Sequence, residues 1–218
     1  MSIIASVLNL SRKDISALKI TDPYSIHRVV FSLFDDVRSE ADKIAGVSSG
    51  ILFADLGGDH ESRRILLLSN RPPAVAIDGE HGVVNSKVLD DEFLTHSTYN
   101  FSTIVNPTRQ SSETQKLVPV KGRENIIAWF CERAPLSWGF SVNPESVRVN
   151  NVDVLTFKSK TQQPITLAQA HIQGTLRVTD PVAFRKSFTS GIGRGRAFGC
   201  GLLQIVRFAE DPFAYSRK

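Results

Sequence analysis

Two residues near the start of the chain, Tyr24 and His27, carry side chains that can transfer protons. They stand three residues apart in a segment where apolar residues recur at helical spacing, so a helix would place them side by side. Because each residue of a helix turns about 100°, the pair points away from the apolar stripe, next to Arg28. Histidine titrates near neutral pH, so the two residues can act as a general acid–base set. The alternative, which is commoner for such a pair taken alone, is an ordinary amphipathic surface or the edge of a core.

The second feature with chemical meaning is the glycine-rich segment GIGRGRAFGCG at residues 191–201. Glycines expose backbone N–H groups and let a phosphate backbone approach closely, and arginine forks bind phosphates. The segment is neither a Walker loop nor a dinucleotide-binding fingerprint, because it lacks the Gly-Lys-Ser/Thr ending of the one and the glycine spacing of the other. We expect contact with phosphate or RNA; a glycine-dependent tight turn between a helix and a strand is the alternative. The residues concerned are Gly191, Gly193, Arg194, Gly195, Arg196, Gly199 and Gly201.

Basic side chains are concentrated at the C-terminal end of the sequence. The chain has 26 Lys and Arg against 22 Asp and Glu, a net charge of +4. Residues 174–218 alone have eight basic and three acidic side chains, so this end carries +5 and the rest of the chain −1. Such a distribution indicates a polyanionic partner, although a solvated basic face has the same signature. Lys158 and Lys160 stand in a polar turn at the tip of an expected hairpin, where they can contact nucleic acid or simply solvent.

Other chemistries lack the residues that they need. The histidines at positions 60, 81, 96 and 171 do not have metal-ligand spacing, and there is no Cys-x-x-Cys pair. Cys131 and Cys200 lie far apart and supply no disulfide framework. No apolar run reaches the roughly 18 residues of a membrane span, and the N-terminal segment is typical of a strand rather than a signal peptide. We expect a cytoplasmic protein with no metal, cofactor or membrane association.

The elements that must position these residues alternate between strands and helices. The chain has 218 residues, enough for one large or two small domains, and 41% of them are hydrophobic, as is typical of globular proteins. Hydrophobic periodicity and turn residues in the first half predict the order β-α-β-β-α-β of a ferredoxin-like unit, a plan shared by many RNA-binding domains. The expected elements are strands at 2–10, 50–55, 64–69 and 97–105, a helix from Pro23 to about Ile44, and irregular structure or a short helix over 71–95.

The second half repeats this pattern. Thr179-Asp180-Pro181 has the same cap-and-proline signal as Thr21-Asp22-Pro23, which favours a helix start at both places. The repetition predicts an α+β protein of two tandem ferredoxin-like (RRM-like) domains, residues 1–110 and 111–218, with the glycine-rich loop in the second. The expected elements of this half are helices at 122–134 and 182–190 and strands at 146–157, 167–178 and 202–208.

Several motifs occur in the order in which one known family has them. The first is DPYSIHR at 22–28 and the last is GIGRGRAFGCGLL at 191–203. Between them are Asn106-Pro107, LVPV at 117–120 followed by IAW at 127–129, and IQGTLRVTDP at 172–181. On these motifs the sequence resembles the CasE proteins, the CRISPR-associated repeat-processing endoribonucleases of type I-E systems. The resemblance covers nearly the whole chain, and its most specific part is the glycine-rich signature.

The resemblance implies a defined reaction. Proteins of this family bind the stem-loop of a CRISPR repeat transcript and cut once at the 3′ base of the stem. The 2′-hydroxyl attacks the adjacent phosphate without a metal and leaves a 2′,3′-cyclic phosphate and a 5′-hydroxyl. The guide RNA stays bound, and the protein becomes a subunit of the Cascade complex. The expected partners are therefore the repeat RNA and the other Cascade subunits, with no small-molecule substrate.

The resemblance also assigns roles to residues. His27 would be the general base or acid, and Tyr24 would orient or polarise the 2′-hydroxyl or the scissile phosphate. Arg194 and Arg196 stand where well-known relatives have proline and lysine; because arginine does not release a proton, both would bind RNA and stabilise the transition state. The alternative is a non-catalytic RNA-binding subunit of the same fold, which would keep the basic end without needing His27. The other RNA-binding residues that the resemblance implies are Arg28, Lys158, Lys160 and the five glycines of the 191–201 segment.

Overall fold

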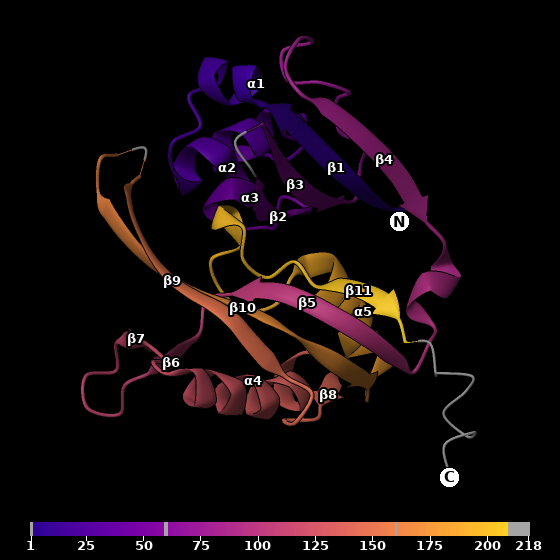
Figure 1. Ribbon diagram of the computed structural model, residues 1–218, viewed down its shortest axis with the longest axis vertical. Helices are drawn as coiled ribbons and strands as arrows, with labels where there is room; N and C mark the ends of the chain where they lie inside the picture. Colours follow the sequence, from indigo (N-terminus) through magenta and orange to yellow (C-terminus); the bar gives the residue numbers. More distant parts are fainter. Residues whose placement is uncertain (1, 59–60, 160, 209–218) are drawn as a thin grey trace.

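The first half of the chain forms a four-stranded antiparallel sheet, the upper sheet in Figure 1. The structure is a computed structural model and describes residues 2–58, 61–159 and 161–208. The strands of this sheet are β1 (Ile3–Ser11), β2 (Ile51–Gly58), β3 (Ser62–Ser69) and β4 (Val83–Leu89). Their order across the sheet is β2-β3-β1-β4, so β1 and β3 are central and β2 and β4 are the edges.

Helix α2 (Pro23–Ser32), which carries the expected acid–base pair, starts where the local sequence predicts. The Asp22 carboxylate accepts a hydrogen bond from the backbone N–H of Ser25 at 2.7 Å. The Ser25 hydroxyl in turn accepts from the backbone N–H of Asp22 at 3.0 Å. This reciprocal capping pairs N–H groups that a helix start otherwise leaves without partners. Pro23 occupies the first turn, where its fixed φ suits a helix.

The predicted end of this helix near residue 44 was wrong. α2 ends at Ser32, and a separate short helix, α3 (Glu40–Ile44), follows after non-helical residues. Val37, which was expected on the apolar face, is 68% exposed, whereas Leu33 is buried. The apolar stripe that holds α2 to the sheet therefore stops at Leu33, and the chain leaves the helix there. A further short helix, α1 (Arg12–Ala17), lies between β1 and α2.

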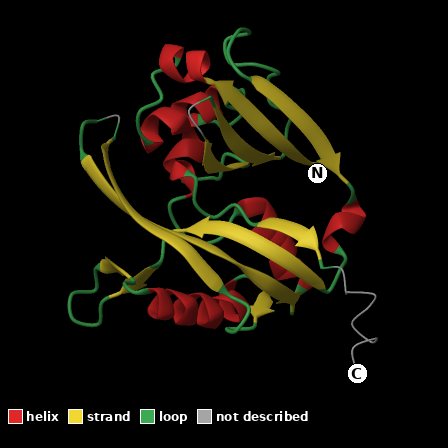
Figure 2. Ribbon diagram, in the orientation of Figure 1, coloured by secondary structure: helices red, strands yellow, loops and turns green. Residues whose placement is uncertain are grey.

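The first sheet is covered on both faces. On one face Leu8 of β1 packs with Ile26 and Val30 of α2 in a core of the first half. On the other face Leu52 and Ala54 of β2 belong to the core of the second half. Figure 2 shows the same arrangement, with helices on one side of this sheet and the second sheet on the other. Burial on both faces explains why β2 begins with a continuous apolar run instead of alternating polar and apolar residues.

The second half forms an antiparallel sheet with two longer helices. Its strands are β5 (Thr98–Val105), β8 (Phe140–Val142), β9 (Arg148–Lys158), β10 (Pro164–Val178) and β11 (Gln204–Arg207). Its helices are α4 (Arg123–Ser137) and α5 (Pro181–Ser190). The order is β11-β5-β10-β8, and β9 pairs with β10 in a long hairpin that extends to the level of α2 in Figure 1 and packs against it. Within the described residues, no helix is long and apolar enough to cross a membrane.

Short elements complete the second half and its connections. Two of them are 3-10 turns, η1 (Asp91–Leu94) after β4 and η2 (Arg196–Phe198) inside the glycine-rich segment. A two-stranded ribbon, β6 (Thr108–Gln110) with β7 (Leu117–Pro119), precedes α4. The core of this half is rich in aromatic rings, and Phe101 stacks on Phe130 with 5.5 Å between ring centroids.

The strand orders confirm the tandem ferredoxin-like fold. When the strands of each half are numbered along the chain, both sheets have the order 4-1-3-2, with β8 and β9 sharing the second place in the second sheet. In each half a helix connects the first strand to the second, and in the second half α5 also connects the third strand to the fourth. The first half has no helix between β3 and β4, so its second crossover is a loop.

Strand β5 pairs in the second sheet, although the sequence pattern placed it in the first unit. Its residues pair with β10 from Thr98↔Arg177 to Val105↔Ala170. The fourth strand of the first sheet is instead β4, in a stretch predicted to be irregular or helical, and that prediction was wrong. β4 is a mostly exposed edge strand, so it lacks the alternating apolar pattern by which strands are predicted. We propose that the domains divide within residues 90–97 rather than near residue 110.

Candidate active site

Tyr24 and His27 lie side by side on α2, as helical spacing predicts. Their ring centroids are 6.1 Å apart and their planes differ by 22°, so the two rings stack. Phe31, one turn further along, packs against His27 with 4.3 Å between centroids. Both Tyr24 and His27 are half-buried, so packed neighbours fix the rings while part of each side chain still reaches solvent.

The glycine-rich loop is packed against this helix. The Nδ1 atom of His27 lies 2.9 Å from the carbonyl oxygen of Ala197 in η2, and the rings of His27 and Phe198 are 6.0 Å apart. The loop itself is fixed from both ends: the N–H of Ile192 donates to the carbonyl of Gly201, and the N–H of Gly201 donates to the carbonyl of Ile104. Residues from opposite ends of the sequence therefore meet at one place.

The partner of Nδ1 determines the chemical state of His27. A carbonyl oxygen only accepts, so Nδ1 must carry the hydrogen, and in neutral imidazole the lone pair is then on Nε2. Burial lowers the pKa of His27 below its ordinary value of 6.5, and the hydrogen bond to Ala197 opposes this shift only in part. At neutral pH the ring is therefore uncharged, with an Nε2 atom that can accept a proton.

The glycines of the loop are required by its own geometry. All five have positive φ, a region that other residues rarely adopt. A Cβ atom on Gly201 would stand 2.3 Å from the carbonyl oxygen of Ile192, whereas one on Gly193 would meet nothing within 4 Å. Close approach of RNA to these glycines stays a prediction. Among the five, Gly193 is the one with open space beside it, so RNA could approach the backbone there. The other three positions are Gly191, Gly195 and Gly199, where a Cβ would meet neighbouring atoms at 2.8, 3.1 and 3.2 Å.

The predicted RNA-binding cations differ in their surroundings. Arg28 on α2, Arg194 in the loop and Lys158 at the end of β9 are exposed. Arg196 is already engaged, because its guanidinium donates to the carbonyl of Ser190 at the end of α5 at 2.8 Å. A cation is favourable at the C-terminal end of a helix, so Arg196 attaches the loop to α5. Lys160 lies outside the described residues.

Comparison with known proteins identifies the family. A family model described as CRISPR associated protein matches residues 3–207. The chain belongs to this family. No curated protein matches the sequence.

Solved structures share the fold of this CRISPR-associated protein. The CRISPR endoribonuclease Cse3 bound to a 19 nt RNA has a TM-score of 0.76 and 20% identity, and the match covers 95% of this chain and 100% of that one. Thermus thermophilus Cse3 bound to an RNA representing a pre-cleavage complex has a TM-score of 0.74, 19% identity and the same coverage. A chain of a CRISPR RNA-guided surveillance complex in a pre-nicking state has a TM-score of 0.68 and 23% identity. That match covers 94% of this chain and 100% of the other. The resemblance seen in the sequence is confirmed at the level of family and fold.

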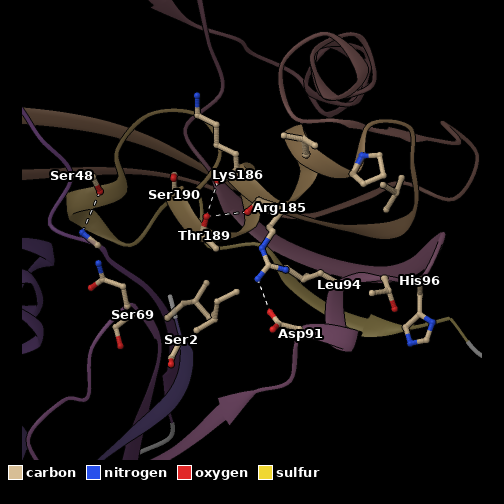
Figure 3. Close-up of a pocket in the computed structure, with 18 of the residues that line it drawn as sticks. Ser2, Ser48, Ser69, Asp91, Leu94, His96, Arg185, Lys186, Thr189 and Ser190 are labelled. Carbon is tan, nitrogen blue, oxygen red and sulfur yellow. Dashed lines mark hydrogen bonds and ion pairs between the residues drawn. The ribbon is translucent and has the colours of Figure 1, made fainter.

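The basic residues of the C-terminal end of this CRISPR-associated protein are not gathered around His27. Figure 3 shows Arg185 and Lys186 in a different cavity, of about 1080 Å³, where Arg185 donates to the Asp91 carboxylate at 2.8 Å. None of the residues that line this cavity belongs to α2 or η2. Arg217 and Lys218 lie outside the described residues. The described part of the basic end is thus distributed over more than one face of the molecule.

Sequence reasoning missed two parts of the site. Ala197 contributes a backbone carbonyl, for which the identity of its side chain gives no signal. Phe198 packs against both His27 and Phe157, and the edge-to-face contact with Phe157, at 4.8 Å between centroids, links the loop to the β9–β10 hairpin. Across residues 2–58, 61–159 and 161–208, no three His, Cys, Asp or Glu side chains are grouped so that they could hold a metal ion.

Proposed function

We propose that this CRISPR-associated protein is an endoribonuclease that binds the stem-loop of a CRISPR repeat and cuts precursor CRISPR RNA at the 3′ base of the stem. One observation carries the proposal: the Ala197 carbonyl holds His27 through Nδ1, Nε2 has no hydrogen bond to any described residue, and Tyr24 stacks beside the ring. The solved relatives support the same activity, since one is described as a CRISPR endoribonuclease bound to RNA and another as bound to an RNA representing a pre-cleavage complex.

In the proposed step, phosphorus forms a bond to the 2′-oxygen and loses its bond to the 5′-oxygen. Nε2 of neutral His27 takes the proton of the 2′-hydroxyl, and the 2′-oxygen attacks the neighbouring phosphorus. The bond between phosphorus and the 5′-oxygen breaks, that oxygen takes a proton from water, and the proton on His27 returns to solvent. The products are a 2′,3′-cyclic phosphate and a 5′-hydroxyl, without a change of oxidation state. Proton transfer by His27 and water is sufficient for these steps, so the proposed reaction is independent of metal.

Tyr24 has a supporting role in this proposal. Its hydroxyl is in no hydrogen bond within the described residues, and its ring stacks on that of His27 with 22° between the planes. A phenolic O–H can donate to a phosphate oxygen or orient the attacking hydroxyl. Charge that develops on the phosphate during attack is thereby stabilised by a group already in place.

The exposed cations would hold the RNA through its phosphates. Duplex RNA is recognised mainly by shape and by contacts to phosphates and 2′-hydroxyls. Arg28, Arg194 and Lys158 are exposed on α2, the loop and β9, and these elements are neighbours because α2 contacts both η2 and β9. The cations therefore lie on, or next to, elements that contact the helix of the acid–base pair.

The cut RNA would remain bound, and the protein would act as a subunit of Cascade. A chain of a CRISPR RNA-guided surveillance complex shares the fold over 94% of this chain, which supports this placement. Retention of the product also agrees with several separate phosphate contacts, because each slows dissociation.

The deciding experiment uses a labelled stem-loop RNA from the host's own CRISPR array, incubated with the protein in EDTA. Wild type, His27→Ala and the matched control His96→Ala are compared, and the product ends are mapped. We expect one cut at the stem base, a cyclic-phosphate end, and a loss of about 10²–10⁴-fold in rate for His27→Ala alone. A 2′-deoxy nucleotide at the cut site should abolish cleavage and leave binding intact.

The outcomes separate the proposal from its alternative. Tight binding without cleavage by the wild type would make the protein a non-catalytic RNA-binding subunit. Cleavage that survives the 2′-deoxy substitution would exclude attack by the 2′-hydroxyl. Thermal unfolding of each variant shows whether a lost activity reflects a lost fold.

A further inference from the structure

A cavity of about 370 Å³ adjoins the proposed active site. Phe198 lines it, and the ring of Phe198 is 6.0 Å from that of His27. Pro23, the residue before Tyr24, also lines it. The cavity and the acid–base pair therefore share a wall, and the volume is within the roughly 300–1,000 Å³ typical of small-ligand sites.

Hydrogen-bond acceptors of the β9–β10 hairpin face this cavity. Asp153 and Gln169 are directly paired across the two strands, so their side chains project on the same face. Gln169 donates its amide N–H to the carbonyl of Phe198 at 3.2 Å, and Asp153 uses one carboxylate oxygen to accept from Asn151 at 2.7 Å. Within the described residues the other Asp153 oxygen and the amide oxygen of Gln169 accept no hydrogen bond. Two neighbouring acceptors are thus available to a ligand.

The excess of carboxylates in the lining disfavours a phosphate as the ligand. Three carboxylates, of Asp22, Asp55 and Asp153, line the cavity together with the imidazole of His171 and one guanidinium, that of Arg63. Arg63 is already held by the Asp55 carboxylate, so it offers little attraction to an anion. A neutral group that carries N–H donors fits the lining, because it satisfies the acceptors without charge repulsion.

The apolar part of the lining fits a flat ring. Phe53 and Phe198 both line the cavity; Phe53 is only 1% exposed and forms its floor, so the half-buried Phe198 is the ring with surface for stacking. Proteins bind unpaired bases of RNA by stacking on aromatic side chains and by hydrogen bonds to the base edges. Aromatic surface and paired acceptors beside a ribonuclease site are the features that such recognition requires.

We infer that this cavity binds one unpaired nucleobase of the substrate, next to the bond that is cut, and that the base is guanine. The inference rests on the proposed function. Guanine alone presents two adjacent donors, N1–H and the 2-amino group, on its Watson–Crick edge, which match the Asp153 and Gln169 oxygens. Guanine also has one acceptor on that edge, O6, but adenine, cytosine and uracil have no two adjacent donors there, so one of their acceptors would face the Asp153 or the Gln169 oxygen. Asp153 and Gln169 are therefore residues that determine specificity, outside the acid–base pair.

The test measures the binding of repeat RNAs made uncleavable by a 2′-deoxy nucleotide at the cut site. The first two unpaired nucleotides after the stem are varied one at a time through all four bases. We expect a preference of about tenfold for guanine at one position, since a bidentate base contact discriminates by roughly 5- to 150-fold. Replacing that guanine by inosine, which lacks the 2-amino group, should weaken binding without any change to the protein.

Protein variants assign the preference to the cavity. Asp153→Asn should remove the preference for guanine and leave the affinity for the other three RNAs within twofold. Glu145→Gln makes the same chemical change on an exposed residue that does not line the cavity, and should keep the preference. Equal binding of all four bases by the wild type, or a preference that persists in Asp153→Asn, overturns the inference while the cleavage assay still supports the proposed function. A wild type that neither binds nor cuts repeat RNA overturns both.

Discussion

The Nδ1 atom of His27 lies 2.9 Å from the carbonyl oxygen of Ala197, a residue 170 positions further along the chain. The contact joins helix α2 of the first half to the glycine-rich loop of the second. It also fixes the tautomer, because a carbonyl can only accept the hydrogen that Nδ1 carries. The state of the histidine thus depends on a backbone group in another domain.

The pH dependence of cleavage should follow from the burial of His27. Burial lowers the pKa of its imidazole below 6.5, so the uncharged, proton-accepting form persists to a lower pH than in a free histidine. We expect the single-turnover cleavage rate to be constant around neutral pH and to fall only below pH 6.5. The measurement is the single-turnover rate as a function of pH, over a range in which RNA and protein are both stable. A half-maximal rate at or above pH 6.5 would contradict the assignment of His27 as the base.

Tyr24→Phe tests the phenolic hydroxyl separately from the ring. The ring keeps its stacking on His27, so the fold and RNA affinity should be unchanged. The cleavage rate should fall by about 10²-fold, as when one preorganised donor to a developing negative charge is removed. Binding and single-turnover rates are measured on the same RNA. An unchanged rate would leave Tyr24 as a packing residue only.

Two glycines of the loop make a matched pair for stability. Gly193→Ala and Gly201→Ala both impose positive φ on an alanine, which costs about 1–2 kcal/mol. Only Gly201→Ala also drives a Cβ atom against the carbonyl oxygen of Ile192. We expect a larger fall in melting temperature for Gly201→Ala, measured by thermal unfolding, and for Gly193→Ala a fall of about 2–8 °C. Equal losses would mean that the loop relaxes around the added methyl group.

The two arginines of the loop should respond in different ways. Arg194 is exposed and binds no carbonyl within the described residues through its side chain, so Arg194→Ala should weaken RNA binding and reduce the salt slope by about one. Arg196 is bonded to Ser190, so Arg196→Ala should lower the melting temperature and slow cleavage through the displaced loop. The measurements are affinity against salt concentration, and thermal unfolding. An unchanged melting temperature for Arg196→Ala would contradict the structural role and would favour direct RNA binding by Arg196.

Local signals in the sequence predicted the elements that have local causes. Helix α2 begins at Pro23 because Asp22 and Ser25 cap it, and all three residues lie within one short stretch of the sequence. The proximity of Tyr24 and His27 follows from helical spacing alone. In the same way Asp180 caps α5, where the second cap-and-proline signal occurs.

Features that depend on distant residues could not be predicted in this way. β5 has an unambiguous strand pattern, but its partners β10 and β11 are far along the chain and leave no mark on its own residues. The Ala197 carbonyl and the cavity at Asp153 arise only when the domains pack together. Asp153 shares one face of β9 with Asn151 and Leu155, and such a mixture of polar and apolar residues is common to many solvated strands.

The contact between His27 and the loop has a consequence for the timing of synthesis. The helix that carries the histidine is translated before the loop, since Ala197 follows His27 by 170 positions. A growing chain that has not yet reached Ala197 holds its histidine without the carbonyl that orients it. Under the proposed function, such a chain is therefore not yet an active nuclease towards transcripts near the ribosome.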